Sequence, residues 1–244
     1  SGGRAYVDIR LALAILYGTM NEPKRIDLHT HSLLSDGALL PSELLRRCAV
    51  RGFEAVAITD HADASNLPGI IEALQRVVTE QRDDFGVTLL VGVELTHVGP
   101  GSIDGLARRA KALGAEVVVV HGETIVEPVA PGTNRAAVEC DAVDVLAHPG
   151  FLTLEEARIA AARGRYVEIT TRKGHALTNG HVARTCLAAG APMVVNTDSH
   201  DPDDLVDLSF AQRVAAGAGL SEAQVLEATL TNPRALLARI LAAR

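Results

Sequence analysis

Histidines and carboxylates recur in this sequence directly after short apolar runs. His29 and His31 follow the first run, and because side chains alternate in extended backbone, both imidazoles can point the same way. Imidazole and carboxylate groups suit Zn, Mn or Fe, and no Cys-x-x-Cys pair adds thiolates. The candidate ligands are the nine residues His29, His31, Asp36, His61, Glu94, His121, His148, Asp198 and His200.

These candidates outnumber the ligands that one tetrahedral ion can use, so we expect two to three divalent ions. Ions held about 3.5 to 4 Å apart can clamp a phosphate and lower the pKa of bound water to about 7. The residue types therefore predict a multinuclear hydrolytic site.

The candidates can meet only if the intervening elements bring them together. Apolar, β-branched runs alternate with longer segments of helical spacing, which is typical of repeated β-α units. In parallel β-α folds the carboxyl ends of the strands form one face, where these side chains would converge. Seven strands are predicted at 25–28, 55–59, 88–93, 116–120, 143–147, 166–170 and 192–196.

Start and stop signals place the helices between these strands. Continuously apolar strands are covered on both faces, which leaves a closed barrel or an open doubly wound sheet. The absence of a Gly-x-Gly-x-x-Gly or Walker-type loop removes the usual support for a nucleotide-binding open sheet. The predicted helices span 41–51, 68–81, 102–113, 153–162, 179–189 and 201–216. Two more are predicted in the tail from 221 to 244. Glycines at 52, 114, 164 and 190 stand where helices should end.

The loop after the sixth strand adds cations to the same mouth. Arg172 could donate two parallel hydrogen bonds to phosphate oxygens, and Lys173 could contribute a positive point charge. His175 could act as the general acid that protonates a leaving alcohol. The alternative is a solvated loop that leads into a helix capped by Asn179.

Two further residues have more than one interpretation. Asp60 could cap the turn after the second strand or orient a ligand histidine. His97 fits no motif, which leaves a structural or surface role, or a supporting role beside the ligands.

Composition limits the class of protein. The length of 244 residues, 48% of them apolar, is compatible with a single domain over 1–244. We interpret residues 1–19 as a tag remnant followed by an amphipathic helix that is too short to span a bilayer. A net charge of -7 disfavours long nucleic acid, and three dispersed cysteines fit a reducing cytoplasm. No membrane partner is expected, and the oligomeric state is not indicated.

Together these motifs resemble the polymerase and histidinol phosphatase (PHP) superfamily, over residues 26–200 and in the same order. The resemblance implies a distorted seven-stranded (βα)7 TIM-like barrel with a trinuclear metal centre. The motifs are His29-x-His31, Ser35-Asp36-Gly37, Thr59-Asp60-His61, Gly92-Val93-Glu94, His121, Ala147-His148-Pro149 and Asp198-Ser199-His200.

The resemblance also implies which residues share an ion. One ion would be held by His29, His31, Glu94 and Asp198, and a second by Glu94, His121 and His148. The third would be held by Asp36, His61 and His200. Many family members have histidine where this chain has Asp36, which could change the preferred metal.

A phosphoesterase acting on a small phosphate monoester is therefore expected, with histidinol phosphate as the family-level substrate. A metal-bound hydroxide would attack phosphorus, Arg172 and Lys173 would neutralise developing charge, and Asp198 would anchor the nucleophile or shuttle its proton. The alternatives are a nuclease or phosphodiesterase of the same superfamily, and a scaffold without catalysis.

Overall fold

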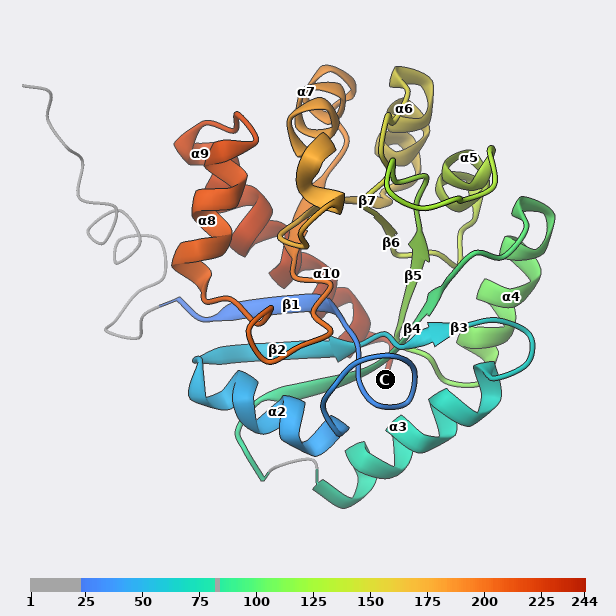
Figure 1. Ribbon diagram of the computed structural model, residues 1–244, viewed down its shortest axis with the longest axis vertical. Coiled ribbons are helices and arrows are strands. Elements are labelled where there is room, and N and C mark those ends of the chain that lie inside the picture. Colours follow the sequence, from blue (N-terminus) through green and yellow to red (C-terminus); the bar gives the residue numbers. More distant parts are fainter. Residues whose placement is uncertain (1–22, 82–83) are drawn as a thin grey trace, which may run out of the picture.

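Strands and helices alternate throughout the computed structural model, which describes residues 23–81 and 84–244 (Figure 1). All strand pairs are parallel, in the order β1-β2-β4-β5-β6-β7-β8, with the short β3 beside β4. The seven predicted strands are confirmed. The strands are β1 Arg25–Thr30, β2 Phe53–Ile58, β3 His61–Ala62, β4 Thr88–Leu95, β5 Val117–His121, β6 Val145–Ala147, β7 Tyr166–Thr170 and β8 Met193–Asn196.

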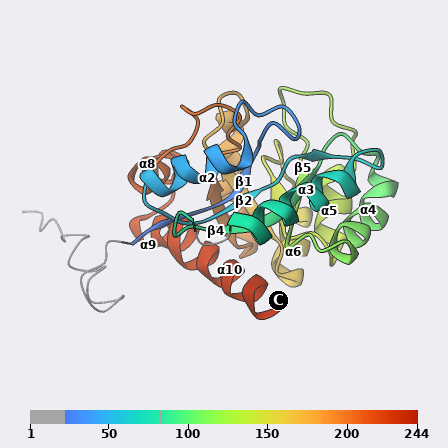
Figure 2. The ribbon, with the colours of Figure 1, turned by 90° about the horizontal axis from the view of Figure 1, so that it is seen from below.

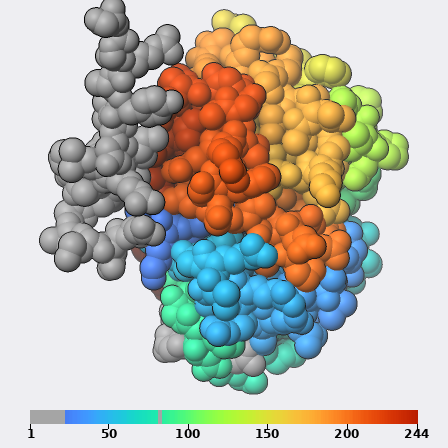
Figure 3. Space-filling model, turned by 60° about the vertical axis from the view of Figure 1, so that its left-hand side comes forward, coloured from blue at the N-terminus to red at the C-terminus, as the bar shows by residue number. Residues whose placement is uncertain are grey.

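The sheet curls into a nearly closed barrel, with β8 returning to β1. A parallel bridge joins Thr30 to Ser199, and the amide of His31 donates to the Ser199 carbonyl at 2.9 Å. The amide of Asp198 donates to the His29 carbonyl at 2.9 Å. The closing contacts therefore lie beside candidate site residues. On the outer face, the orange segment before α8 lies against α2 (Figure 3).

Helices cover the outside of the barrel. They are α2 Pro41–Val50, α3 Leu67–Gln81, α4 Pro100–Ala112, α5 Thr133–Glu139, α6 Leu154–Arg163, η1 His175–Thr178, α7 Asn179–Ala189, α8 Leu208–Gly217, α9 Glu222–Leu226, the π-helical turn η2 Glu227–Thr231 and α10 Asn232–Ala242. Gly164 and Gly190 adopt left-handed backbone at the C-caps of α6 and α7, as expected.

The predicted helix over 201–216 is wrong at its start, because α8 begins only at Leu208. Asp207 is its N-cap, accepting the amide of Phe210 at 2.7 Å. The earlier Asp204 instead accepts the amides of His200 and Asp201 at 3.0 Å, which holds a loop. Several aspartates compete as caps here, and the sequence pattern does not distinguish them. The pattern also does not predict α5 or β3, which are only seven and two residues long.

The strands separate two apolar cores. The outer core lies between the strands and the surrounding helices, and the inner core fills the barrel. Leu236, Leu237 and Ile240 of α10 belong to the inner core, and Figure 2 shows α10 beneath the strands, at the end opposite the long loops. The strands are therefore buried on both faces, and of the two arrangements left open above, the closed one is found.

A buried ion pair helps to join β1 to β8. Arg25 and Asp27 lie 3.0 Å apart with side chains 1% and 0% exposed. Asp27 Oδ1 also accepts the amide of Thr197 at 3.1 Å, just beyond β8. Loss of Asp27 would leave the Arg25 charge buried and uncompensated.

The N-terminal helix expected within residues 1–19 lies outside the described residues. Within 23–81 and 84–244, no helix has the length and apolar character needed to cross a membrane.

We expect Asp27→Ala to destabilise the protein by about 3–5 kcal/mol, because it leaves the buried charge of Arg25 without a partner of opposite sign. Urea unfolding followed by circular dichroism measures this. Asp84→Ala, at an exposed aspartate before β4, is the control and should change stability by less than about 0.5 kcal/mol. Equal stability of the two variants would contradict the role given to the pair.

Candidate metal centre

The innermost group of candidates is fully buried where β1 and β4 end. His29 Nε2 lies 3.3 Å from Glu94 Oε1, and both side chains are 0% exposed. His31 Nε2 lies 3.2 Å from Asp198 Oδ1. His148 Nε2 lies 3.5 Å from Asp198 Oδ2, so strands one, four, six and eight each contribute to this point.

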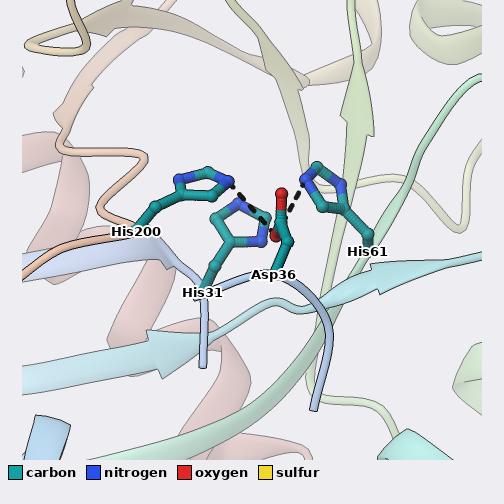
Figure 4. Close-up of side chains that lie close together, drawn as sticks. All are labelled: His31, Asp36, His61 and His200. Carbon is teal, nitrogen blue, oxygen red and sulfur yellow. Dashed lines mark ion pairs between the residues drawn. The ribbon is translucent and has the colours of Figure 1, made fainter. Parts of the chain in front are cut away.

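A second group lies nearer to solvent around Asp36 (Figure 4). Asp36 Oδ1 is 3.4 Å from His61 Nε2 and 3.3 Å from His200 Nε2, and the His31 ring packs behind them. The Asp36 side chain is 55% exposed. A divalent ion coordinated by this group would be accessible from outside.

The third group contains His121, whose ligand nitrogen lies within 4.8 Å of those of His148 and His175. His148 Nε2 is 3.7 Å from Glu94 Oε1, the carboxylate that the resemblance assigns to the same ion. The structure thus brings all nine predicted residues to one end of the barrel, in buried clusters consistent with a multinuclear metal site.

The orientation of three imidazoles leaves nitrogen lone pairs facing the carboxylates. His200 Nδ1 lies 3.0 Å from the Asp198 carbonyl, and His121 Nδ1 lies 3.1 Å from the Gly122 carbonyl. A carbonyl only accepts, so both Nδ1 atoms carry the proton. His29 Nδ1 likewise donates to Glu168 Oε2 at 2.8 Å. In each neutral ring the Nε2 lone pair then faces oxygen, an arrangement that a cation stabilises.

Glu94 gives an independent sign that a cation fits. Its Oε1 is buried and has no hydrogen-bond donor among the described residues. A buried carboxylate oxygen without a partner is costly, and metal coordination is one of the few ways to satisfy it. The nitrogen and oxygen donors suit borderline divalent ions such as zinc.

Burial keeps part of the centre uncharged. Desolvation lowers the pKa of His31 and of His148 well below the usual value, so both rings offer a free lone pair at neutral pH. Desolvation also raises the pKa of Asp198 to about 7. Asp198 can therefore take up or release a proton near neutrality.

Other histidines attract protons when no metal neutralises the acids. Burial opposes the charged form of His29, but Glu168 and Glu94 outweigh it and raise the pKa well above the usual value. Burial likewise opposes charge on His61, where Asp36 and Glu94 raise the pKa to about 10. Protons thus occupy positions where we propose metal ions.

The backbone is strained at the same place. Within the described residues, the non-glycine residues with positive φ are His97, His148 and Asp198, at 53°, 25° and 51°. Such conformations cost about 1–3 kcal/mol each and persist where the surroundings impose them, commonly at functional sites.

Glu168 and Asn196 support the centre, and no motif singled them out for this. Glu168 Oε2 accepts from His29 and from Asn196 Nδ2 at 3.0 Å, while Asn196 Oδ1 accepts the Leu28 amide. The only signal for Glu168 was its position, a carboxylate in the sixth predicted strand.

The Asp60 side chain holds a loop in place. Its carboxylate accepts from the amide and hydroxyl of Ser32 at 2.7 Å and from the Ser35 hydroxyl at 2.6 Å. These contacts fix the loop that carries Asp36, which supports the turn interpretation.

The loop after β7 contributes unequally to a cavity of about 280 Å³ at the mouth. Arg172 lines the cavity and donates to Asp204 Oδ2 at 2.8 Å. His175 also lines it, 7% exposed and stacked on His148 with ring centroids 4.2 Å apart. Lys173 is exposed and outside the lining. The solvated-loop interpretation therefore fits Lys173 but not His175.

Comparison with known proteins agrees with this geometry. The family model described as PHP domain matches residues 27–124. An uncharacterized protein of Methanocaldococcus jannaschii, MJ1295, is 48% identical over 219 residues, 88% of this chain and 100% of that protein. The chain belongs to the PHP domain superfamily.

More distant relatives carry different names. A probable phosphatase of Syntrophotalea carbinolica is 28% identical, covering 84% of this chain and 92% of that protein. Ribonuclease P protein component 3 of Methanosarcina mazei is 26% identical, covering 89% and 90%.

A solved structure supports the fold. The histidinol phosphate phosphatase of Lactococcus lactis, crystallised with zinc, L-histidinol and phosphate, has a TM-score of 0.58 at 16% identity, covering 81% of this chain and 95% of that one. The (βα)7 PHP-type barrel expected from the sequence is confirmed.

Metal uptake should release protons and weaken as pH falls. The raised pKa values of His29 and His61 mean that these two rings are protonated in the metal-free protein at pH 7, and the pKa of His200 is shifted in the same direction. Each displaced proton should weaken the apparent affinity about tenfold per unit of falling pH. Zinc calorimetry in buffers of different ionisation enthalpy measures the release. Heats that do not depend on the buffer would contradict it.

Glu168→Gln should lower metal affinity about 10- to 100-fold while the barrel still folds, because a neutral amide oxygen is a weaker acceptor for the His29 ring than the carboxylate that orients it. Competition with a chromophoric chelator measures this. Glu156→Gln, which changes the partly buried capping-box carboxylate of α6 to another residue that suits the box, is the control and should bind metal like the parent.

Proposed function

We propose that this PHP protein is a metal-dependent phosphoesterase that hydrolyses a small phosphate monoester. The observation that carries the proposal is the gathering of nine candidate ligands at one end of the barrel, where five of them line a small cavity together with Arg172. A volume of about 280 Å³ accommodates a small substrate.

We assign the ligands as the resemblance implies. His29, His31, Glu94 and Asp198 would hold one ion, with Glu94 shared with His121 and His148 for a second. Asp36, His61 and His200 would hold the third. Bound divalent ions would supply charge neutralisation for phosphate oxygens and activation of water at neutral pH. The choice among Zn, Mn and Fe belongs to this proposal.

Asp198 and Arg172 are assigned roles beside the ions. Asp198, with its pKa near 7, would hold or pass a proton within the cavity. Asp204 fixes one end of the Arg172 guanidinium, which leaves other N–H donors for phosphate oxygens. His175 Nε2 lies 4.0 Å from Asp198 Oδ2 and would be a second group able to transfer a proton.

For the substrate we propose histidinol phosphate as the first compound to test. The support is the shared fold with the Lactococcus lactis phosphatase and the similarity to probable phosphatases. We propose single-domain organisation and a cytoplasmic location as in the sequence analysis, with Lys173 as an outer point charge.

A nuclease or phosphodiesterase is the second candidate. It is supported by similarity to ribonuclease P protein component 3, while the net charge of -7 opposes binding of a polyanion. A panel of phosphate monoesters, diesters and oligonucleotides, assayed with each metal separately, separates the candidates. Cleavage of diesters alone would exclude the monoester proposal.

Asp198→Asn should lower kcat by at least about 10³-fold, because a neutral amide neither neutralises a cation nor exchanges the proton. Steady-state hydrolysis of the best monoester measures this, with Asp63→Asn as the exposed control. An active Asp198→Asn protein would contradict the assignment, and a wild-type protein that binds metals but cleaves no phosphate ester would favour the scaffold alternative.

Arg172→Ala should reduce kcat/KM about 10²- to 10³-fold, as loss of a donor to developing negative charge does. Arg172→Lys should recover only part of this because lysine lacks the fork. Lys173→Ala should have a smaller effect, since Lys173 lies outside the cavity lining. The ranking of the three variants is the test.

A further inference from the structure

Thr96 and Glu127 line the cavity at the mouth, and no sequence motif predicted either of them. Glu127 lies on the loop between β5 and α5, where its Oε2 is 3.0 Å from His97 Nε2. Thr96 comes directly after β4, two residues beyond Glu94. Of the two, Thr96 is bonded to residues that belong to different ion positions of the proposed centre.

The Thr96 hydroxyl lies between His61 and Glu94. Its Oγ1 is 2.5 Å from His61 Nδ1, and it donates to Glu94 Oε2 at 3.0 Å. His61 Nδ1 is also 2.9 Å from Glu94 Oε2. An ionised carboxylate only accepts, so Nδ1 carries a proton and shares it between the Thr96 hydroxyl and the Glu94 carboxylate.

These bonds fix the orientation of the His61 ring. With Nδ1 held on the inner side, the opposite nitrogen Nε2 is directed toward Asp36 Oδ1, 3.4 Å away (Figure 4). The His61 side chain is 25% exposed, whereas Glu94 is 0% exposed, so the buried carboxylate is the fixed end of the link. The ring is therefore set to present Nε2 to an ion held near Asp36.

The two oxygens of Glu94 have different partners. Oε1 faces His29 Nε2 at 3.3 Å and has no hydrogen-bond donor within the described part of the chain, so it is available to the buried ions. Oε2 instead accepts from Thr96 and lies beside the Nδ1 proton of His61. An acceptor on the second ring nitrogen of a ligand histidine orients the ring and raises its basicity toward the metal.

We propose that Thr96 is a positioning residue for the exposed ion, acting through His61 and linking that ion to the buried ones through Glu94. The inference rests on the proposed metal centre, in which Asp36, His61 and His200 hold the exposed ion. Without the hydroxyl, His61 Nδ1 would keep only the Glu94 contact and the ring would be held less firmly. The exposed position would then be filled less tightly than the buried ones.

Thr96→Val removes the hydroxyl and keeps the branched shape, whereas Thr96→Ser keeps the hydroxyl. After equilibration with buffered zinc, metal per chain is measured by elemental analysis and the affinity of the weakest ion by competition with a chromophoric chelator. Thr96→Val should bind that ion about 10- to 100-fold less tightly, and Thr96→Ser should bind it nearly as wild type does. Thr79→Val is the matched control, because it removes an exposed hydroxyl that donates to the Gln75 carbonyl on α3.

Asp36→Ala removes a proposed ligand of the same ion and separates positioning from a general loosening of the centre. Because both changes act on one position, Thr96→Val should have little further effect on zinc binding in the Asp36→Ala background. Wild-type affinity for every ion in Thr96→Val would overturn this inference alone, and so would equal weakening of all the ions or a failure of Thr96→Ser to recover binding. A wild-type protein that binds no metal would instead overturn the proposed function.

Discussion

Atoms that carry lone pairs face one another at the mouth of this barrel, and that arrangement requires positive charge between them. The Nδ1 protons of His29, His121 and His200 are directed away to fixed acceptors, which leaves Nε2 facing carboxylates. In the metal-free state, protons supply the charge, as the raised pKa of His61 to about 10 shows. Divalent ions would supply it more fully, since each carries two positive charges.

Such a cluster repels itself, so the rest of the fold must hold it in place. Parallel strands bring the donors to one end, and the inner core, covered by α10, fills the barrel from the other end. Glu168 and Asp60 add hydrogen bonds that fix a ring and a loop. The positive φ of His148 and Asp198 shows that some of the stability gained in the cores is offset at the site.

How much of this could be predicted depends on where each residue lies relative to a strand. His29, Glu94 and His148 could be placed because parallel strands end at one face, whatever the loops do. Glu127 could not be placed from the sequence, because it lies on a loop whose position depends on contacts of Glu123 and Gly150. Glu123 belongs to no recognisable motif, and Gly150 is distant in sequence. The start of α8 was misplaced for a related reason, since Asp204 bonds to a loop rather than capping a helix.

The charges around the cavity favour a substrate that binds only when metal is present. Asp36 and Glu127 expose carboxylates at the opening, and Arg172, the arginine of the lining, is already paired with Asp204. A phosphate approaching the metal-free protein would meet these carboxylates beside protonated imidazoles such as His61, and bound divalent ions would add the further positive charge that attracts it. A polyanion such as RNA would also meet the negative charge of the rest of the chain, whose net charge is -7. Attraction confined to the mouth therefore favours a single terminal phosphate, which is the form of a small monoester.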